Sequence, residues 1–385
     1  MKYLSEEKIE NKNVILRCDF NVPVKDGVIT DDSKIIKSLK TIKYLLDNGN
    51  RVILLSHFGR IKKNEDKEKN SLKIVYEYLK RYINLVFVEN NENVEFYLNT
   101  SKCNCFLLEN TRFTDIPEKR ESKNNLELAK YWASFGDVFV LDAFGSMHRT
   151  HSSTAGIGAY LPTYLGFLVS EELDNLKVLV ESKNVPFVVI MGGAKVDDKI
   201  LIIKSMLEKC DKLVLTGGIL NTFLKVMGKN IGNSLVSEDE EVLNSVKEVI
   251  TNYKEKIIYS DKFIVLRNDE VKEVTIDEIN NEDIIYDNII NLDLIGNEII
   301  FFNGTCGKCE DNRFSTGTKK LLEDLSNSSA KVIIGGGDTV SSVIKLGYDN
   351  KFNYLSSGGG ATLEYVAYGS LKALEFIKEN SVENN

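Results

Sequence analysis

The sequence predicts an α/β protein with two doubly wound, largely parallel-sheet (Rossmann-like) domains joined by a long interdomain helix. Short runs of β-branched and aromatic residues alternate with stretches in which apolar residues recur every three or four positions, which is the rhythm of β-α-β units. This alternation occurs twice along the chain. Its 385 residues also exceed what one hydrophobic core usually serves, so two domains are expected.

The first half of the chain supplies one set of predicted strands and a well-marked helix. Apolar residues at helical spacing predict a helix over Asp32 to Asp47. Five short apolar runs read as buried strands, which are typical of parallel sheets. They are Asn13 to Leu16, Arg51 to Leu55, Asn84 to Val88, Cys105 to Leu108 and Asp137 to Leu141.

The second half repeats the pattern with a different set of turns. Strands are predicted at Pro186 to Ile190, Lys212 to Leu215, Glu298 to Phe302 and Lys331 to Ile334. Helices are expected to start near Lys195, Glu238, Thr316 and Gly337. The acidic stretch Lys262 to Asp293 is strand-like, and VLRNDEVKEV within it resembles a β-ribbon.

One uninterrupted helical pattern separates the two halves. Leu161 to Val180 has no turn residues beyond Pro162 at its start, where proline is tolerated, so it is the expected connector. The expected division is a first domain over 1–162, an interdomain helix over 163–181, a second domain over 182–365, and a C-terminal helical segment over 366–385 that packs back on the first domain.

Composition excludes several classes of protein. A net charge of -8 argues against broad nucleic-acid binding, which requires a dense basic face. No apolar run is long enough to cross a membrane, and the first residues do not resemble a secretory signal, so a cytoplasmic location is expected. Six cysteines in so long a chain do not form a disulfide framework and fit a reducing compartment.

Polar and basic residues follow the predicted strands of the first half. The carboxyl ends of parallel strands meet at one edge of a sheet, where ligands of such folds bind. Several guanidinium groups at such an edge would bind a small anion with a phosphate or carboxylate. The residues concerned, together with Lys34 near the first helix, are Asp19, Asn21, His57, Arg60, Arg112 and Arg149. Taken singly, each arginine is better explained as a surface residue paired with a neighbouring acid, but the set placed after successive strands favours an anion site.

Glycine-rich turns characterise the second half and indicate phosphate binding. IIGGGDT follows a predicted strand and opens a helix, so Gly336 and Gly337 allow backbone N–H groups to approach a phosphate. Asp338 would then hold Mg²⁺ with phosphate oxygens, although it could equally be a plain helix cap. MGGAKVDDK places Lys195 and Lys199 near a helix start, where they would contact phosphates or remain solvated.

Common nucleotide signatures are absent, and the remaining glycine pairs are ambiguous. The chain has neither a GxxxxGK[ST] P-loop nor a GxGxxG fingerprint, which weakens the prediction of a generic ATPase or dehydrogenase. Gly217 and Gly218 in LTGGIL are explained as well by a simple turn as by a nucleotide contact.

The motifs, taken in order, resemble those of phosphoglycerate kinase from about Arg17 to Glu364. They are RCDFNVP, ITDDSKI, SHFGR, LLENTRF, DAFGSMHRTHSS, GGAKVDDKI, FNGTCGKCE, GGGDT and SSGGGATLE. The resemblance implies reversible transfer of a phosphoryl group between ATP and 3-phosphoglycerate, giving ADP and 1,3-bisphosphoglycerate. It also implies a 3-phosphoglycerate site on the first domain, a Mg-nucleotide site on the second, closure around the connector, and a monomer.

The resemblance assigns expected roles residue by residue. Asp19, Asn21, Lys34, His57, Arg60, Arg112 and Arg149 would bind phosphoglycerate. Lys34, Lys195, Gly358, Gly359 and Gly360 would act on the phosphoryl group in flight. The nucleotide would be bound by Lys195, Lys199, Gly217, Gly218, Asn303, Glu310, Gly336, Gly337, Asp338 and Thr339, with Asp338 as the Mg²⁺ ligand.

The sequence departs from the family pattern at several places. Lys34 stands where the family has an arginine, and lysine lacks the planar fork that bridges two oxygens, so slower transfer is expected. IIYDNIINLD replaces a Gly-Pro-rich nucleotide loop, which puts nucleotide contacts there in doubt. Cys306 and Cys309 form a CxxC, and a redox or zinc role with Cys103 and Cys105 is an alternative to a nucleotide loop.

Two other functions compete with an active kinase. A degenerate paralogue would bind nucleotide or phosphoglycerate with weak or no turnover and act as a regulator or scaffold, and Lys34 is the main support for it. A nicotinamide dehydrogenase would need a dinucleotide fingerprint, which the sequence lacks.

Overall fold

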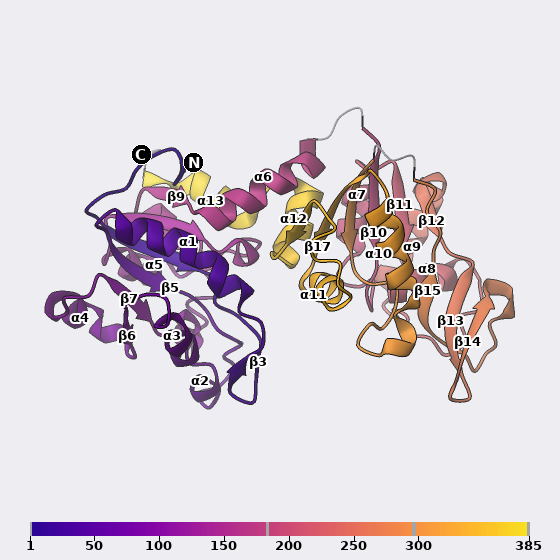
Figure 1. Cartoon of the computed structure of the whole chain (residues 1–385), viewed down its shortest axis with the longest axis horizontal. Helices are drawn as coiled ribbons and strands as arrows, with labels where there is room; N and C mark the ends of the chain where they lie inside the picture. The colour runs from indigo at the N-terminus through magenta and orange to yellow at the C-terminus, as the bar shows by residue number, and fades with distance from the viewer. Residues whose placement is uncertain (1, 182–184, 295–297, 383–385) are drawn as a thin grey trace. The chain divides into compact units, whose positions relative to one another are not determined.

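A computed structural model describes residues 2–181, 185–294 and 298–382 of the chain. The chain falls into two compact units (Figure 1). The first comprises residues 1–174 and 370–385, and the second comprises residues 175–369. Helix α6 (Phe167–Glu181) contains the boundary between them.

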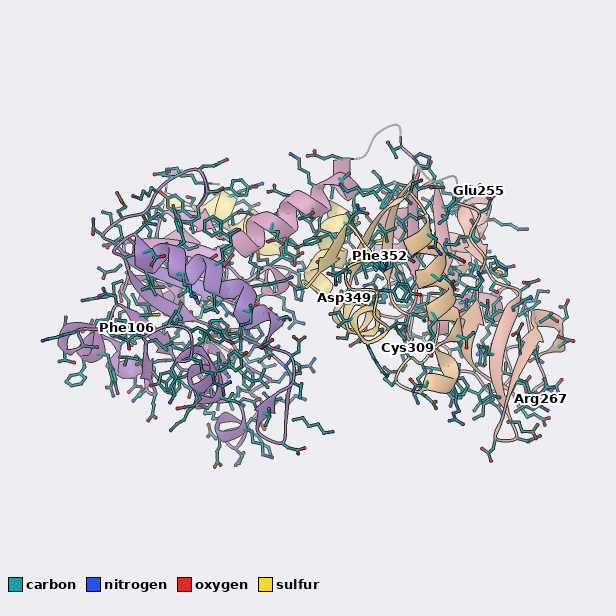
Figure 2. The ribbon with its side chains drawn as sticks, viewed as in Figure 1. Phe106, Glu255, Arg267, Cys309, Asp349 and Phe352 are labelled. Atoms are coloured by element: carbon teal, nitrogen blue, oxygen red, sulfur yellow. The ribbon has the colours of Figure 1, made fainter. Side chains whose placement is uncertain are left out.

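A seven-stranded parallel sheet forms the centre of the first unit, in the order β1-β9-β8-β2-β5-β7-β6. Its strands are β1 (Lys2–Tyr3), β2 (Asn13–Cys18), β5 (Arg51–Leu55), β6 (Val86–Val88), β7 (Cys105–Leu108), β8 (Val138–Asp142) and β9 (Thr163–Leu165). The central strands are apolar along almost their whole length because helices and loops cover both faces. Phe106 of β7, for example, is fully buried (Figure 2).

Helices and short 3-10 turns surround this sheet. Helix α1 packs on β2 and β5 with Ile35, Leu39, Ile42 and Leu45, the apolar positions expected from the sequence. The helices are α1 (Ser33–Asp47), α2 (Asp66–Lys69), α3 (Lys73–Leu79), α4 (Val94–Thr100), α5 (Leu126–Ala133) and α13 (Lys372–Asn380). The first unit also contains a small hairpin of β3 (Val24–Lys25) and β4 (Val28–Ile29). Its 3-10 helices are η1 (Asn91–Asn93), η2 (Thr111–Asp115), η3 (Phe144–Ser146) and η4 (Gly156–Ala159).

Helix α13, close to the C-terminus, packs on the first unit. The backbone N–H of Ala373 donates to the carbonyl of Met147 at 3.0 Å. A Cβ atom on Gly158 would come within 2.8 Å of Ile377, so the glycine allows α13 to lie close to η4.

The second unit contains a six-stranded parallel sheet, in the order β12-β11-β10-β16-β17-β18. Its strands are β10 (Phe187–Met191), β11 (Lys212–Leu215), β12 (Ile257–Tyr259), β16 (Ile299–Asn303), β17 (Lys331–Gly335) and β18 (Tyr354–Ser356). Counted from β10, this is the 3-2-1-4-5-6 order of doubly wound sheets. Strands of this sheet before β16 are added on one side of β10, and β16 and later strands are added on its other side. The loops after β10 and β16 therefore flank the expected ligand crevice.

Six helices and an antiparallel sheet accompany the second parallel sheet in the part of the chain that the structure describes. The helices are α7 (Ile200–Leu207), α8 (Gly217–Val226), α9 (Glu240–Tyr253), α10 (Thr316–Asn327), α11 (Gly337–Lys345) and α12 (Gly360–Tyr368), and the 3-10 helices are η5 (Lys254–Lys256), η6 (Ile276–Glu278) and η7 (Asn312–Phe314). Strands β14 (Glu270–Thr275), β13 (Lys262–Arg267) and β15 (Ile284–Ile289) form the antiparallel sheet, which confirms the predicted β-ribbon.

The predicted fold class is confirmed, with two corrections to the elements. Thr163 to Leu165 is a strand that pairs with β8 and β1, so the prediction of a continuous helix over Leu161 to Val180 is wrong at its start. The helix begins at Phe167, where Asp142 Oδ1 accepts the N–H groups of Leu168 and Val169 at 2.9 and 3.1 Å. The carboxylate at the end of β8 therefore caps α6.

The second correction concerns the helix expected near Lys195. Helix α7 begins at Ile200, and Lys199 is its N-cap residue. The intervening residues form a loop and a turn, with Gly193 at a φ of +110°, closed by a hydrogen bond from Lys199 N to Val196 O at 2.8 Å. Lys195 and Lys199 are therefore not neighbours on one turn of a helix. No helix among the described residues is long and apolar enough to span a membrane.

Candidate active site

In the first unit, the predicted anion-binding residues follow four neighbouring strands. Asp19 and Asn21 follow β2, and His57 follows β5. Arg112 lies in η2 after β7, and Arg149 follows β8. Because β8, β2, β5 and β7 are adjacent and parallel, all of these residues come from the same edge of the sheet.

Lys34 and Asp19 form an ion pair at this edge. The ammonium group of Lys34, from the first turn of α1, lies 2.8 Å from Asp19 Oδ2. Burial alone would raise the pKa of Asp19, but the charge and hydrogen bond of Lys34 outweigh it and hold that pKa below its usual value. The same carboxylate raises the pKa of Lys34. Both groups are therefore charged at neutral pH.

Asn21 and Arg112 are tied together through the backbone of Gly59. Asn21 Oδ1 accepts the N–H of Gly59 at 2.9 Å, and a terminal nitrogen of Arg112 donates to the carbonyl of Gly59 at 2.6 Å. Asn110 Oδ1 also accepts the N–H of Phe58 at 3.1 Å and that of Arg112 at 3.0 Å. Hydrogen bonds thus connect the loops after β2, β5 and β7 to one another.

The charges at this edge are mostly positive. Burial, followed by the charges of Arg17 and Arg149, lowers the pKa of Arg112. Burial and the charges of Arg17 and Arg112 also lower the pKa of His151 to about 3. Mutual repulsion among these cations would be relieved by a bound anion. Arg60 and Arg149 are exposed, and Arg149 Nε donates to His148 Nε2 at 3.0 Å.

In the second unit, Lys199 links the loops that follow β10 and β16. Its ammonium group donates to the carbonyl of Gly192 at 2.9 Å and to Asn303 Oδ1 at 2.8 Å. The Asn303 amide in turn donates to the carbonyl of Gly335 at 2.8 Å, at the end of β17. Burial lowers the pKa of Lys199 to about 8, although the charges of Asp338 and Asp198 oppose the shift.

Three helices of this unit start at glycine-rich turns that are evident in the sequence. Helix α11 starts at Gly337, after Gly336 with a φ of +100°, and α12 starts at Gly360, after Gly359 with a φ of +57°. Helix α8 starts at Gly217, whose N–H donates to Asn288 Oδ1 at 2.8 Å. A helix N-terminus presents free N–H groups and the positive end of the helix dipole, so it favours phosphate.

Several predicted nucleotide residues have structural partners or lie on the surface. Thr339 is buried, and its Oγ1 accepts the N–H of Gly304 at 2.7 Å. Gly218 lies against the backbone of Ala194, where a Cβ atom would come within 2.1 Å of its carbonyl oxygen. Lys195, Glu310 and Asp338 are exposed. Gly358 donates its N–H to Ser356 Oγ at 3.3 Å.

The residues at the start of α11 fit a magnesium ion carried by phosphates. Asp338 is an exposed carboxylate in the first turn of that helix. Among the described residues, no group of three or more His, Cys, Asp or Glu side chains could hold a metal by itself. Mg²⁺ usually takes one or two carboxylates and completes its coordination with phosphate oxygens and water, which one carboxylate beside a phosphate site allows.

Sequence reasoning missed several residues that organise the site. Arg17 contacts His57 from within β2, and an arginine inside an apolar run was the available signal. Asn288 lies in the segment IIYDNIINLD, where nucleotide contacts were in doubt, and its Oδ1 accepts the N–H of Gly217 at the start of α8. Asp287 beside it accepts the N–H of Gly317 at 2.8 Å at the start of α10, and burial raises its pKa to about 7.

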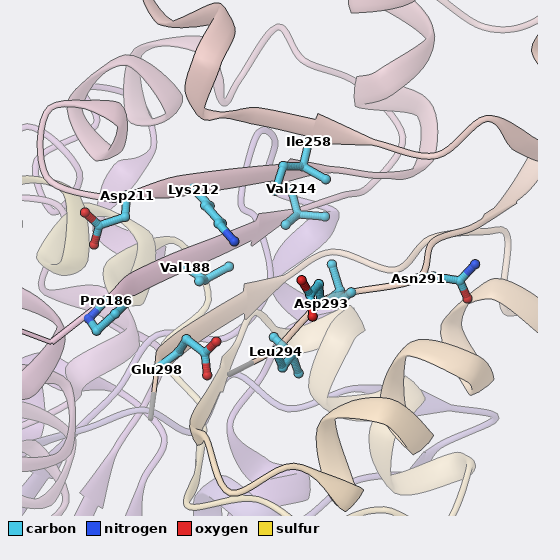
Figure 3. Close-up of a pocket in the computed structure, with 11 residues that line it drawn as sticks. Pro186, Val188, Asp211, Lys212, Val214, Ile258, Asn291, Asp293, Leu294 and Glu298 are labelled. Atoms are coloured by element: carbon cyan, nitrogen blue, oxygen red, sulfur yellow. The ribbon is translucent and has the colours of Figure 1, made fainter. Parts of the chain in front are cut away.

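The cysteine pair is buried beside Thr318, and a cavity of the second unit lies at the opposite ends of the strands from Lys199 and Asn303. Cys306 and Cys309 are free and buried, and both contact the hydroxyl of Thr318. A cavity of about 380 Å³ lies over β10 and β11 (Figure 3). Pro186, Lys212 and Glu298 line it at or just before the amino ends of their strands, the opposite ends from Lys199 and Asn303.

Two doubly wound units, one with a cationic edge and one with glycine-rich helix starts, have the features that a phosphotransferase of the kinase class requires. The comparisons with known proteins identify the family. The phosphoglycerate kinase family matches residues 4–368. The chain belongs to this family, so it is an enzyme, and nothing in the comparisons favours the catalytically degenerate alternative.

Relatives and solved structures agree over nearly the whole chain. The phosphoglycerate kinase of Macrococcus caseolyticus is 40% identical, with 98% of this chain and 99% of the relative covered. That of Mesomycoplasma hyopneumoniae is 39% identical, with 98% of each chain covered. The solved phosphoglycerate kinase of Coxiella burnetii is 33% identical and has a TM-score of 0.83, with 99% of both chains covered.

Proposed function

We propose that the cationic edge of the first unit binds 3-phosphoglycerate and that the glycine-rich edge of the second unit binds Mg-ATP or Mg-ADP. The reaction is reversible transfer of the terminal phosphoryl group of ATP to the carboxylate of 3-phosphoglycerate. The observation that carries the proposal is the joining of three strand ends, by Asn21, Gly59 and Arg112, into one hydrogen-bonded edge that bears cationic side chains. Arg60 and Arg149 would add their guanidinium groups to it.

Within the first unit, the proposed roles follow from charge and donor geometry. Arg112 offers a planar fork to phosphate or carboxylate oxygens, and His57 offers a ring N–H. Lys34 neutralises charge that develops on the transferring group, while Asp19 holds its ammonium group at 2.8 Å. A carboxylate oxygen of phosphoglycerate attacks the phosphorus atom in line, and the bond to the leaving ADP oxygen breaks.

Within the second unit, backbone N–H groups and lysines bind the nucleotide phosphates. Gly336 and Gly337 with Thr339, at the start of α11, and Gly217 and Gly218, at the start of α8, form the loops against which the nucleotide lies. The backbone N–H groups of Gly358, Gly359 and Gly360 stabilise the charge on the transferring phosphoryl oxygens. Lys195, Lys199, Asn303 and Glu310 complete the proposed nucleotide contacts.

Asp338 would hold the magnesium ion together with phosphate oxygens. When bound, Mg²⁺ neutralises charge on the nucleotide phosphates. We further propose that the enzyme acts as a monomer in the cytoplasm, as expected for this family.

Ligand binding to two single variants tests the assignment of one substrate to each unit. Arg112→Met should weaken 3-phosphoglycerate binding by about a hundredfold, since it removes a charge-assisted fork, and leave ADP binding within about twofold. Lys199→Met should weaken ADP binding and leave 3-phosphoglycerate binding within about twofold. Calorimetric titration of each variant with each ligand separates the outcomes. The assignment is wrong if Arg112→Met weakens ADP binding as strongly as it weakens phosphoglycerate binding.

A further inference from the structure

Arg17 is a buried arginine inside strand β2, behind the residues proposed to bind phosphoglycerate. Its side chain has no exposed surface. One terminal nitrogen donates to the carbonyl of Cys18 at 2.6 Å and reaches that of Leu55 at 3.4 Å. The other terminal nitrogen lies 3.0 Å from Nδ1 of His57. The guanidinium group thus joins the ends of β2 and β5 to the imidazole ring.

The chemistry of this contact determines which nitrogen of His57 carries a proton. A guanidinium group has only donors, so His57 Nδ1 must accept the hydrogen bond. A neutral imidazole that accepts at Nδ1 carries its proton on Nε2. An imidazolium ring would direct an N–H at the guanidinium, so protonation would break the contact and place two cations together.

The surroundings of His57 also oppose its protonation. Its ring is buried, with 7% of the residue exposed. Burial, followed by the charges of Arg17 and Arg112, holds the pKa of His57 well below its usual value. The charged and titratable groups that act on the ring come from separate elements: Arg17 from β2, Lys34 from α1, Arg112 from η2 and His151 from the loop after η3.

A buried acidic side chain, Glu121, is among the groups that act on the charge of Arg17. Glu121 is fully buried, and its side chain accepts hydrogen bonds from the hydroxyl of Ser153 and, at 3.2 Å, from the backbone N–H of Ser153. Burial lowers the pKa of Arg17, and the charges of Glu121 and Asp19 oppose that shift. Neither carboxylate hydrogen-bonds to the guanidinium among the described contacts, so its terminal nitrogens remain available to two backbone carbonyls and to His57.

We propose that Arg17 is a positioning residue that locks His57 as the neutral Nε2–H tautomer, so that the ring presents a permanent hydrogen-bond donor to an anionic oxygen of the substrate. No hydrogen bond to His57 Nε2 is described, so this N–H is the ring's remaining polar group. The part of the proposal that names the acceptor rests on the proposed phosphoglycerate site. The tautomer itself does not depend on any ligand.

His148 provides an internal reference, because its hydrogen bond favours the opposite tautomer. Arg149 Nε donates to His148 Nε2 at 3.0 Å, so His148 must accept at Nε2 and carry its proton on Nδ1. The protein has three histidines, His57, His148 and His151, so its imidazole nitrogen signals are few. His57→Gln and His148→Gln variants would assign them.

Nitrogen-15 NMR of the unliganded wild-type protein tests the proposal directly. We expect His57 to show a protonated Nε2 and an unprotonated Nδ1, unchanged between about pH 5.5 and 8.5. A protonated Nδ1, or a titration near the usual histidine value of about 6.5, would overturn the proposal. Because this measurement needs no substitution at Arg17, it does not depend on the folding of a variant.

Variants of Arg17 separate positioning from general stabilisation. In Arg17→Met we expect His57 to titrate and the KM for 3-phosphoglycerate to change by about three- to tenfold between roughly pH 5.5 and 8. Arg17→Lys keeps a charged donor and should restore the single tautomer and the flat KM profile. A flat profile and an unchanged tautomer in Arg17→Met would contradict the proposal.

Addition of 3-phosphoglycerate distinguishes failure of this inference from failure of the proposed function. A ligand-induced shift of the His57 Nε2–H signal supports both. If the tautomer is as expected but saturating phosphoglycerate leaves that signal unmoved, the substrate role proposed for His57 is wrong while the effect of Arg17 stands.

Discussion

Lys34 lies in the motif ITDDSKI, where the resemblance to the family leads us to expect an arginine. Its ammonium group lies 2.8 Å from Asp19 and keeps its charge. An ammonium is a point charge, whereas a guanidinium bridges two oxygens in a plane. Lys34 can therefore still neutralise negative charge on a phosphoryl group, but it cannot bridge two oxygens as a guanidinium group does.

Lys34→Arg should raise the turnover number by at least about tenfold, because arginine side chains that contact a transferring phosphoryl group make large contributions to its rate. KM for 3-phosphoglycerate should change less than the turnover number. Steady-state kinetics of both forms measure the effect, with Lys37→Arg on the same helix as a control that should have none. An unchanged turnover number in Lys34→Arg would show that lysine is sufficient here.

Lys199 should make nucleotide affinity depend on pH. Its pKa is lowered to about 8 by burial, so the ammonium group is charged below that pH and loses its proton above it. ADP affinity should therefore fall by roughly tenfold as the pH rises through about 8 to 10.

Lys199→Arg should remove this pH dependence, since arginine stays charged. Titrations with ADP at several pH values measure it. An equally steep fall in Lys199→Arg would assign the effect to another group.

At the scale of single residues, sequence could identify side chains that follow strands but not those that support them. Asp19, His57 and Arg112 stand out because polar groups at strand ends suggest a site. Arg17 lies inside a strand, and two of its three partners, His57 and the carbonyl of Leu55, are far from it in sequence. Only the three-dimensional pairing of β2 and β5 shows what its donors contact.

At the scale of elements, the starts of helices position the proposed nucleotide site. Helix α8 starts beside the loop after β10, and a Cβ atom on Gly218 would meet the Ala194 carbonyl at 2.1 Å. That contact is with backbone, which cannot move aside as a side chain can. Gly337, at the start of α11, has no atom within 4 Å of the same position.

Gly218→Ala should lower the stability of the second unit by about 1–3 kcal/mol, whereas Gly337→Ala should have little effect. For a unit of this size, each kcal/mol lowers the melting temperature by roughly 2–4 °C. Thermal unfolding of the two variants gives the comparison. Equal melting temperatures would show that the loop containing Ala194 moves away at low cost.

Sequence patterns predicted the apolar strands and helix α1 well, and they failed where an element depends on pairing or loop contacts rather than on local pattern. Helix α1 follows the predicted range closely because its apolar positions repeat at helical spacing. Strand β9 has three residues and is stabilised by pairing with β8 and β1, which local pattern does not reveal. Helix α7 starts late because the residues from Gly192 to Lys199 form a loop held by hydrogen bonds to the loop after β16.

At the scale of the whole molecule, the proposed function assigns one substrate to each of two doubly wound units. The repeated β-α-β rhythm predicted two such units, and both sheets are present. The roles of individual residues followed from ordered motifs rather than from the fold, since doubly wound sheets serve many chemistries. The reaction that this fold catalyses is therefore determined by the side chains at the ends of its strands, not by the sheets themselves.

A coupled assay with ATP, Mg²⁺ and 3-phosphoglycerate tests the central claim most directly. An active phosphoglycerate kinase should form ADP only when both substrates and Mg²⁺ are present, and Arg112→Met should abolish most of that turnover at a fixed phosphoglycerate concentration. Calorimetric binding of both ligands by the wild-type protein, with no ADP formation above background, would contradict the claim.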